Sequence, residues 1–155
     1  MKRRIFLKGS LATGVLAIAA GAGILKPVRV LAAEWPAAAF DAEDAATALK
    51  TYFGGDNATD SDEVKIKAPV QAENGAVVPI KIETTAADLE SIAVVVEGNP
   101  RPLVLSLDIG EGVGGYLSGR VKMGKTSNLV AYVKSGGNLL RASQEIKVTV
   151  GGCGG

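Results

Sequence analysis

Histidine is absent from this 155-residue sequence, cysteine occurs once, and aromatic residues make up only 5% of the chain. Without histidine the chain cannot build a Ser-His-Asp triad or a Cys-His pair. With a single cysteine it also lacks a haem-attachment motif and a conventional zinc cluster. The three tyrosines are too scattered to form an aromatic strip for binding. These shortages exclude the commonest nucleophilic enzymes and metal sites.

The first 33 residues have the pattern of an export signal. The pair Arg3-Arg4 precedes an apolar run rich in glycine and alanine over 9–25, and small residues follow over 30–33. This order predicts a cleavable signal of the twin-arginine type and a periplasmic protein. The apolar run is too short and too rich in glycine for a permanent membrane anchor, which needs ~20 apolar residues. The twin-arginine route exports folded proteins, so an attached partner is expected.

Removing the signal reverses the sign of the net charge. Six of the 17 basic residues and none of the 16 acidic ones precede Glu34, so the rest of the chain has 11 basic and 16 acidic residues and a formal charge of −5. Nucleic-acid binding depends on neutralising phosphates with lysine and arginine. The acidic balance therefore argues against a nucleic-acid partner and suits basic partner surfaces.

A short helix is predicted just after the signal. Asp41 is the expected N-cap, Leu49 and Phe53 recur at helical spacing, and Gly54-Gly55 ends the helix. We expect Phe40, Leu49 and Phe53 to cover one end of the following domain. The acidic segment 56–63 lacks the glycine and terminal glutamate of a calcium loop, so it is expected to be a solvated loop.

From Val64 onward the sequence consists of short alternating apolar runs separated by turn residues. The seven predicted strands are 64–68, 78–83, 92–96, 103–109, 117–123, 129–134 and 139–150. Strands at regular spacing with no helices between them predict an immunoglobulin-like antiparallel β-sandwich. The predicted organisation is thus a signal over 1–33, a sandwich domain with its helix over 34–150, and a tail over 151–155.

The tail reads Gly151-Gly152-Cys153-Gly154-Gly155 and contains the only cysteine. Four glycines around one thiol offer nothing to pack, so we expect a flexible arm in which Cys153 is held by Gly151, Gly152, Gly154 and Gly155. Fully extended, five residues reach about 17 Å at ~3.3–3.6 Å per residue. Such an arm is narrow enough to enter a deep cleft in another protein.

Nothing in the tail activates the sulfur as an enzyme's own nucleophile. An unperturbed thiol has a pKa of ~8.5, and no lysine, histidine or helix N-terminus lies nearby in the sequence. The simpler alternatives are an incidental exposed thiol or a weak dimer bridge, but an unpaired thiol is a liability in an oxidising compartment. We therefore interpret Cys153 as a covalent attachment point on which other proteins perform chemistry.

The sequence resembles the SoxY family, the sulfur-carrying subunits of the thiosulfate-oxidising Sox system. The resemblance rests on the segment 68–80, the turn 98–102, the terminal Gly-Gly-Cys-Gly-Gly motif and the twin-arginine signal. It implies that Cys153 carries the sulfur adduct, with no other cofactor and no metal. It also implies a SoxZ-like β-sandwich partner, a SoxAX-like cytochrome that joins thiosulfate to Cys153, and a SoxB-like hydrolase that releases sulfate.

Two other classes of protein remain as alternatives. A ubiquitin-like sulfur carrier also ends in Gly-Gly, but it is charged in the cytosol on its terminal carboxyl and has a central helix. A structural or adhesive β-sandwich subunit with an incidental C-terminal thiol is the second. An independent enzyme is the weakest option, because a mobile thiol has no fixed base or oxyanion donors around it.

Overall fold

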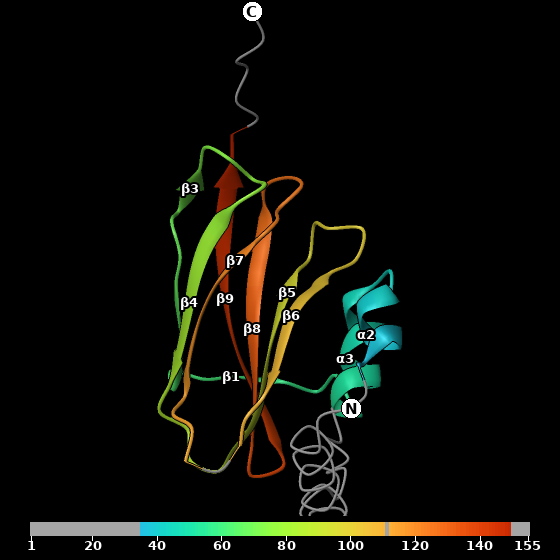
Figure 1. The fold of residues 1–155 in the computed structure, drawn as a ribbon, viewed down its shortest axis with the longest axis vertical. Coiled ribbons are helices and arrows are strands. Elements are labelled where there is room, and N and C mark those ends of the chain that lie inside the picture. The colour runs from blue at the N-terminus through green and yellow to red at the C-terminus, as the bar shows by residue number, and fades with distance from the viewer. Residues whose placement is uncertain (1–34, 111, 150–155) are drawn as a thin grey trace, which may run out of the picture. The chain divides into compact units, whose positions relative to one another are not determined.

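The computed structural model describes residues 35–110 and 112–149, which form a β-sandwich with two helices beside it (Figure 1). The elements in chain order are α2 Ala37–Asp41, α3 Ala45–Phe53, β1 Thr59–Asp60, β2 Val64–Lys67, β3 Gln71–Ala72, β4 Val78–Thr84, β5 Leu89–Val96, β6 Leu103–Asp108, β7 Tyr116–Val121, β8 Ser127–Ser135 and β9 Asn138–Val148. Each of the seven predicted strands has its counterpart among β2 and β4–β9, so the predicted β-sandwich is confirmed.

The strands form two sheets. The larger sheet has the order β1-β9-β8-β5-β6, with β3 also paired to β9, and the smaller sheet has the order β2-β4-β7. The long strands pair antiparallel as predicted, whereas β1 and β3 run parallel to β9. These two short strands were not predicted, because two residues are too few to show an alternating pattern.

The main core lies between the two sheets and follows from the alternation along each strand. Every second side chain of β4, β5 and β8 points into the space between the sheets and is buried. These inward-facing residues are Val78, Ile80, Ile82, Ile92, Val94, Val96, Leu129, Ala131 and Val133. Because a strand directs successive side chains to opposite faces, the opposite faces of β5 and β8 need a cover of their own.

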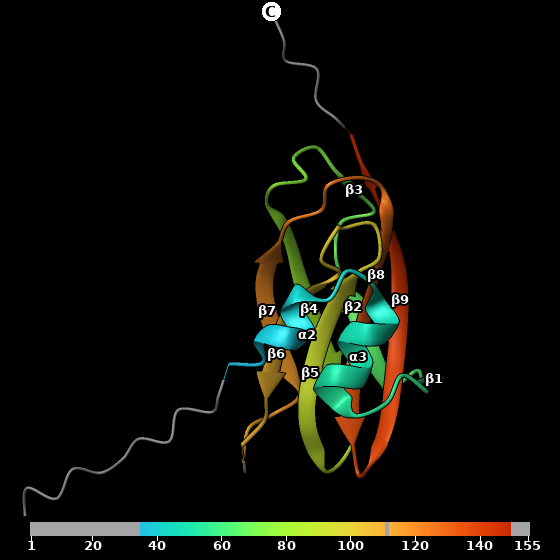
Figure 2. The same ribbon diagram turned by 90° about the vertical axis from the view of Figure 1, so that its right-hand side faces the viewer.

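That cover is provided by the helices, which corrects our expectation that they close one end of the sandwich. Leu49 of α3 belongs to a second buried cluster with Ala93, Val95 and Val130, whose side chains point away from the smaller sheet. Figures 1 and 2 show α2 and α3 over this face of the larger sheet. For this reason the five consecutive apolar residues of β5 from 92 to 96, and Ser91 before them, are all buried. None of the described helices is long and apolar enough to cross a membrane.

The predicted helix start was wrong by three residues. Asp41 is the last residue of a separate helix, α2, and the N-cap of α3 is Asp44, whose Oδ1 accepts a hydrogen bond from the backbone N–H of Thr47 at 2.8 Å. The predicted end is confirmed: Gly54 follows α3 with a φ of 80°. The Tyr52 hydroxyl donates a 2.7 Å hydrogen bond to Asp108, which joins α3 to β6. Burial, and then this bond, raise the pKa of Tyr52 to about 12.

The acidic segment 56–63 contains no buried residue, in keeping with the predicted solvated loop, but two of its residues form the short strand β1. Asp60 lies in β1, and its Oδ1 is 2.8 Å from Nε of Arg141 on β9. Asp56 pairs with Lys50 of α3 at 3.2 Å. Asp56 and Asp60 thus pair with separate cations. Among the residues that the structure describes, no group of three or more His, Cys, Asp or Glu side chains is placed to hold a metal ion.

Candidate functional site

The predicted attachment residue, Cys153, lies outside the described residues, as do Gly151, Gly152, Gly154 and Gly155. Thr149 is the last described residue before them, directly after β9. The structure therefore defines the site through its root, meaning the end of β9 from which the chain continues towards Cys153.

The end of β9 is hydrogen-bonded on both sides. On one side it pairs with β3, and on the other its backbone meets the side chain of a residue that precedes β8. The bonds are Lys147 N to Val70 O (2.9 Å), Thr149 N to Ala72 O (3.1 Å) and Val148 N to the Thr126 hydroxyl (2.9 Å). Ile146, three residues before the last described position, is fully buried. The root is consequently anchored up to Thr149, only four residues before Cys153.

The turn 73–77 packs against this root. Oδ1 of Asn74 accepts a hydrogen bond from the N–H of Ala76 at 2.9 Å, a contact by which asparagine favours a turn. The carbonyl of Gly75 accepts a 2.7 Å hydrogen bond from the N–H of Met123. A Cβ on Gly75 would overlap the Met123 carbonyl oxygen and come within 2.8 Å of Cγ1 of Val148. Glycine is therefore required here for close backbone approach.

The turn 98–102 is hydrogen-bonded to the loop that follows β7. The side chain of Asn99 donates to the carbonyl of Lys122 at 2.7 Å and accepts from the N–H of Gly124 at 3.0 Å. This loop includes Met123, which bonds to the turn 73–77. The two internal segments quoted for the family resemblance therefore meet at the end of the sandwich where β9 ends. Their turn signals were visible in the sequence, but nothing in the sequence linked them to β9.

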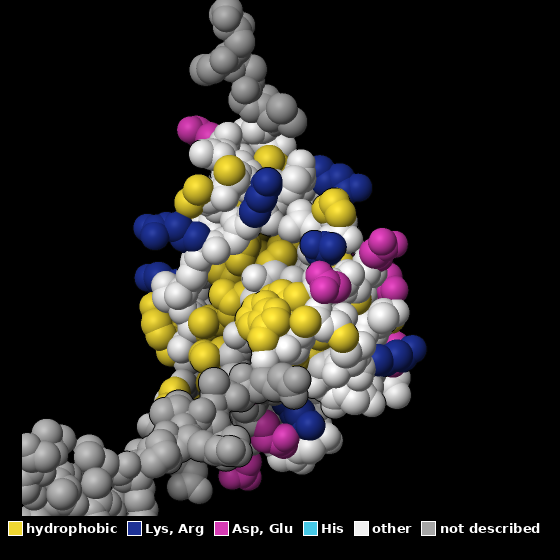
Figure 3. Space-filling model, turned by 45° about the vertical axis from the view of Figure 1, so that its right-hand side comes forward, with side chains coloured by type: hydrophobic (Ala, Val, Ile, Leu, Met, Phe, Trp, Pro, Cys, Tyr) yellow, Lys and Arg dark blue, Asp and Glu magenta, His cyan; other side chains and the backbone are white. Residues whose placement is uncertain are grey.

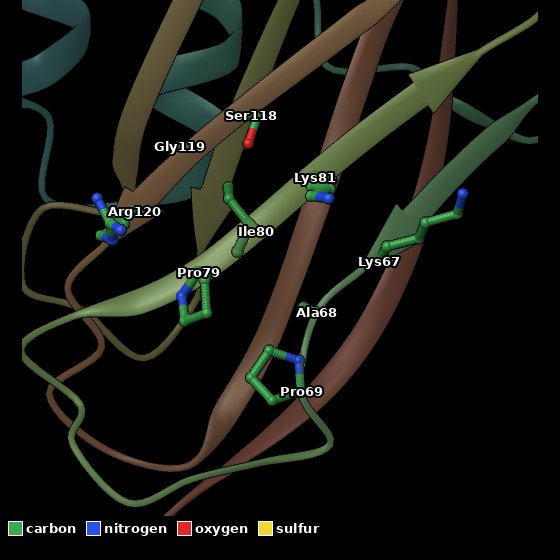
Figure 4. Close-up of a pocket in the computed structure, with 9 residues that line it drawn as sticks. All are labelled: Lys67, Ala68, Pro69, Pro79, Ile80, Lys81, Ser118, Gly119 and Arg120. Carbon is green, nitrogen blue, oxygen red and sulfur yellow. The ribbon is translucent and has the colours of Figure 1, made fainter.

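A shallow groove of about 630 Å³ runs over the outer face of the smaller sheet (Figure 4). Its cationic residues are Lys67 of β2, Lys81 of β4 and Arg120 of β7, and Figure 4 shows Lys81 between the other two. Pro69 and Pro79 lie together at one side of the groove in the same view. Sequence reasoning missed this groove, because its cations come from three strands that are joined only by sheet pairing.

The groove has an excess of positive charge. Lys67 lies directly opposite Lys81 in the β2–β4 pairing, and like charges in this position repel. Nζ of Lys67 is 2.7 Å from a carboxylate oxygen of Glu83, which offsets one charge. In the part of the chain that the structure describes, Lys81 and Arg120 have no ion-pair partner. Two cations thus remain available to an anion.

A different side of the sandwich is apolar. The edge strands β6 and β7 lie next to each other here, since a Cβ on Gly119 would be 3.3 Å from Cδ1 of Leu105. The apolar side chains of this β6–β7 seam are Val104, Leu105, Leu107, Tyr116 and Leu117, of which Leu107 is 37% and Tyr116 53% exposed. Figure 3 shows apolar side chains gathered on one face within a rim of charged ones. Such a patch is typical of a protein interface.

Comparison with protein families shows a match to the family described as sulfur oxidation protein SoxY, over residues 49–153. The matched range covers the second half of α3, every strand that the structure describes and the position of Cys153. No curated protein matches the chain.

Among solved structures, the sulfur carrier protein SoxY from Chlorobium limicola f thiosulfatophilum is 39% identical, with a TM-score of 0.61 over 66% of this chain and 94% of that one. A superoxide reductase (neelaredoxin) from Ignicoccus hospitalis is 18% identical with a TM-score of 0.49 over 56% of this chain and 79% of that one, which is too distant to bear on function. The sandwich and the two SoxY matches define a carrier protein of sulfur oxidation. More specifically, the chain belongs to the SoxY family.

Proposed function

We propose that this protein is a periplasmic carrier that holds sulfur intermediates of thiosulfate oxidation covalently on Cys153 and presents them to partner enzymes. The main support is that the family match extends through Cys153, four residues beyond the anchored end of β9. The twin-arginine pattern of residues 1–33 supports export.

The proposed chemistry has two steps. In the first, the Cys153 thiolate and the outer sulfur of thiosulfate form an S–S bond. The two electrons released go to a SoxAX-like cytochrome, and the product is a cysteine S-thiosulfonate. In the second, water attacks the sulfonate sulfur in a SoxB-like hydrolase. The bond between this sulfur and its neighbour breaks, sulfate and a proton leave, and a persulfide remains on Cys153. The carrier supplies only the attachment atom in both steps.

The anchored root and the glycine arm suit this role for complementary reasons. The body supplies a fixed origin, because Val70, Ala72 and Thr126 hold the end of β9. From Thr149 the chain to Cys153 spans at most about 14 Å at ~3.3–3.6 Å per residue. A reach of this size brings the sulfur into a partner's cleft while the body stays outside. Each encounter is brief, because ordering glycine costs entropy and offers little contact area.

We also propose that the carrier has no catalytic activity of its own and works as a heterodimer with a SoxZ-like β-sandwich subunit. The chain has no histidine to serve as a base for the thiol. The β6–β7 seam is the surface that we assign to the partner, because it combines two sheet edges with exposed apolar side chains. Export of the preformed pair would explain the use of a route for folded proteins.

Intact-mass measurement of the protein from the periplasm of thiosulfate-grown cells tests the carrier function. We expect mass additions on the peptide that contains Cys153, and their loss on reduction. Cys153→Ser should abolish both the additions and thiosulfate oxidation. As a matched control, Ser143→Cys in the Cys153→Ser background places a thiol on the exposed middle of β9 and should not restore oxidation. Normal thiosulfate oxidation by Cys153→Ser would leave only the structural-subunit alternative.

A further inference from the structure

The groove over β2, β4 and β7 lies close to the root of the arm. Pro69 is three residues before Ala72, whose carbonyl bonds to Thr149. Three residues span at most about 11 Å, so this side of the groove lies within reach of a sulfur attached four residues beyond Thr149. Pro79, on the same side, follows the turn 73–77, which packs against Val148.

The charge of the groove complements one particular state of Cys153. A thiosulfonate adduct ends in a sulfonate, which is negatively charged at every physiological pH. The unmodified thiol, with an ordinary pKa of ~8.5, is mostly neutral at pH 7. Lys81 and Arg120, which lack ion-pair partners among the described residues, can therefore distinguish the loaded arm from the empty one.

We propose that this groove holds the arm when Cys153 carries an anionic adduct, with the sulfonate between Lys81 and Arg120 and the glycines against Pro69 and Pro79. The inference rests on the proposed carrier function and adds a resting position for the loaded arm. Docking protects the adduct from stray thiols between visits to partner enzymes. Because exposed charge pairs are weak, the arm still leaves the groove readily.

The test uses the purified full-length protein loaded with tetrathionate. The Cys153 thiolate attacks a central sulfur of tetrathionate, an S–S bond breaks, thiosulfate leaves, and the S-thiosulfonate forms with no net oxidation or reduction. The measured quantity is the rate at which 2-mercaptoethanol, a neutral thiol, removes the adduct, followed by intact mass. We expect Lys81→Gln/Arg120→Gln to accelerate this removal about fivefold at low salt, the size of effect that two exposed ion pairs give. High salt should abolish the difference.

Two controls isolate the groove. Lys50→Gln/Lys134→Gln removes the same net charge from α3 and from the end of β8 and should leave the rate unchanged. Methyl methanethiosulfonate gives a neutral methyl disulfide on Cys153, and its removal should proceed at one rate in all variants.

Equal removal rates of the anionic adduct in the wild type and in Lys81→Gln/Arg120→Gln would overturn the proposal. So would an equal acceleration with the neutral adduct. If the groove variant instead loses binding to a partner enzyme while adduct removal is unchanged, the groove is a protein-binding surface and the proposal is wrong. Failure of the carrier function is a separate result, because it would appear as unmodified Cys153 in cells even when the loaded protein behaves as expected in vitro.

Discussion

At the scale of single residues, the root of the arm depends on close contacts that leave no room for side-chain atoms. Gly75 is the clearest case, because its backbone lies against both the Met123 carbonyl and the side chain of Val148. The same residue accepts the hydrogen bond from Met123 N that joins the turn to the loop after β7. One glycine thus holds together three segments that are far apart in the sequence.

Gly75→Ala should therefore destabilise the protein by about 1–3 kcal/mol, the usual cost of overpacking a filled site. Urea denaturation measures the change in the free energy of unfolding. Gly55→Ala is the matched control: a Cβ there meets nothing within 4 Å, so the change should be neutral or slightly stabilising. Equal effects of the two substitutions would show that the close packing around Gly75 is unimportant.

At the scale of elements, α3 depends on its N-cap for a defined start. Hydrogen bonds from Thr47, first of all from its backbone N–H, lower the pKa of the Asp44 carboxyl. A carboxyl whose pKa is lower in the folded state contributes stability above its unfolded pKa of ~3.9. That contribution falls as the pH drops through the folded pKa, because protonation removes the acceptor charge.

Asp44→Asn keeps an acceptor at the N-cap but removes the negative charge that favours a helix N-terminus, so it should lower the melting temperature by a few degrees near pH 7, and the difference from the wild type should shrink as the pH falls below about 4. Thermal denaturation followed by circular dichroism at a series of pH values measures it. Asp62→Asn changes the same charge on a residue with no hydrogen bond or ion pair to a described residue and serves as control. A difference that persists unchanged to pH 2 would contradict the linkage to the Asp44 carboxyl.

At the scale of the whole molecule, different surfaces of the sandwich have different proposed roles. The helices cover the outer face of the larger sheet, and the cationic groove occupies the outer face of the smaller one. The β6–β7 seam is thus the side that combines unpaired strand edges with exposed apolar side chains such as Leu107 and Tyr116. A partner that packs on this seam leaves the end of β9 open to visiting enzymes.

Leu107→Lys/Tyr116→Lys should weaken binding of the SoxZ-like subunit at least about tenfold, since charges at the centre of an apolar interface are costly. Titration calorimetry or native mass spectrometry of the reconstituted pair measures the affinity. Val77→Lys changes a side chain that is 49% exposed near the root of the arm and should bind normally. Normal binding by the double variant would show that the partner binds a surface other than the β6–β7 seam.

Local sequence patterns predicted the long strands, but not the short strand β3 or the exact start of α3. Alternation found β4 and β9 within one to two residues, because a strand with one buried face must repeat every two residues. The same reasoning missed β3, since a two-residue strand has no period, and placed the cap of α3 at Asp41, since two aspartates three residues apart are equally good candidates for the cap. Both errors were resolved by contacts that only the folded chain makes.

The sequence by itself determined the alternating strands, the twin-arginine pattern, the glycine-flanked Cys153 and the family resemblance, because each is a property of neighbouring residues. Only the tertiary structure decided that the turns 73–77 and 98–102 meet at the end of β9, and that Lys67, Lys81 and Arg120 share one groove. Those arrangements depend on strand pairing between distant segments, which local periodicity does not encode.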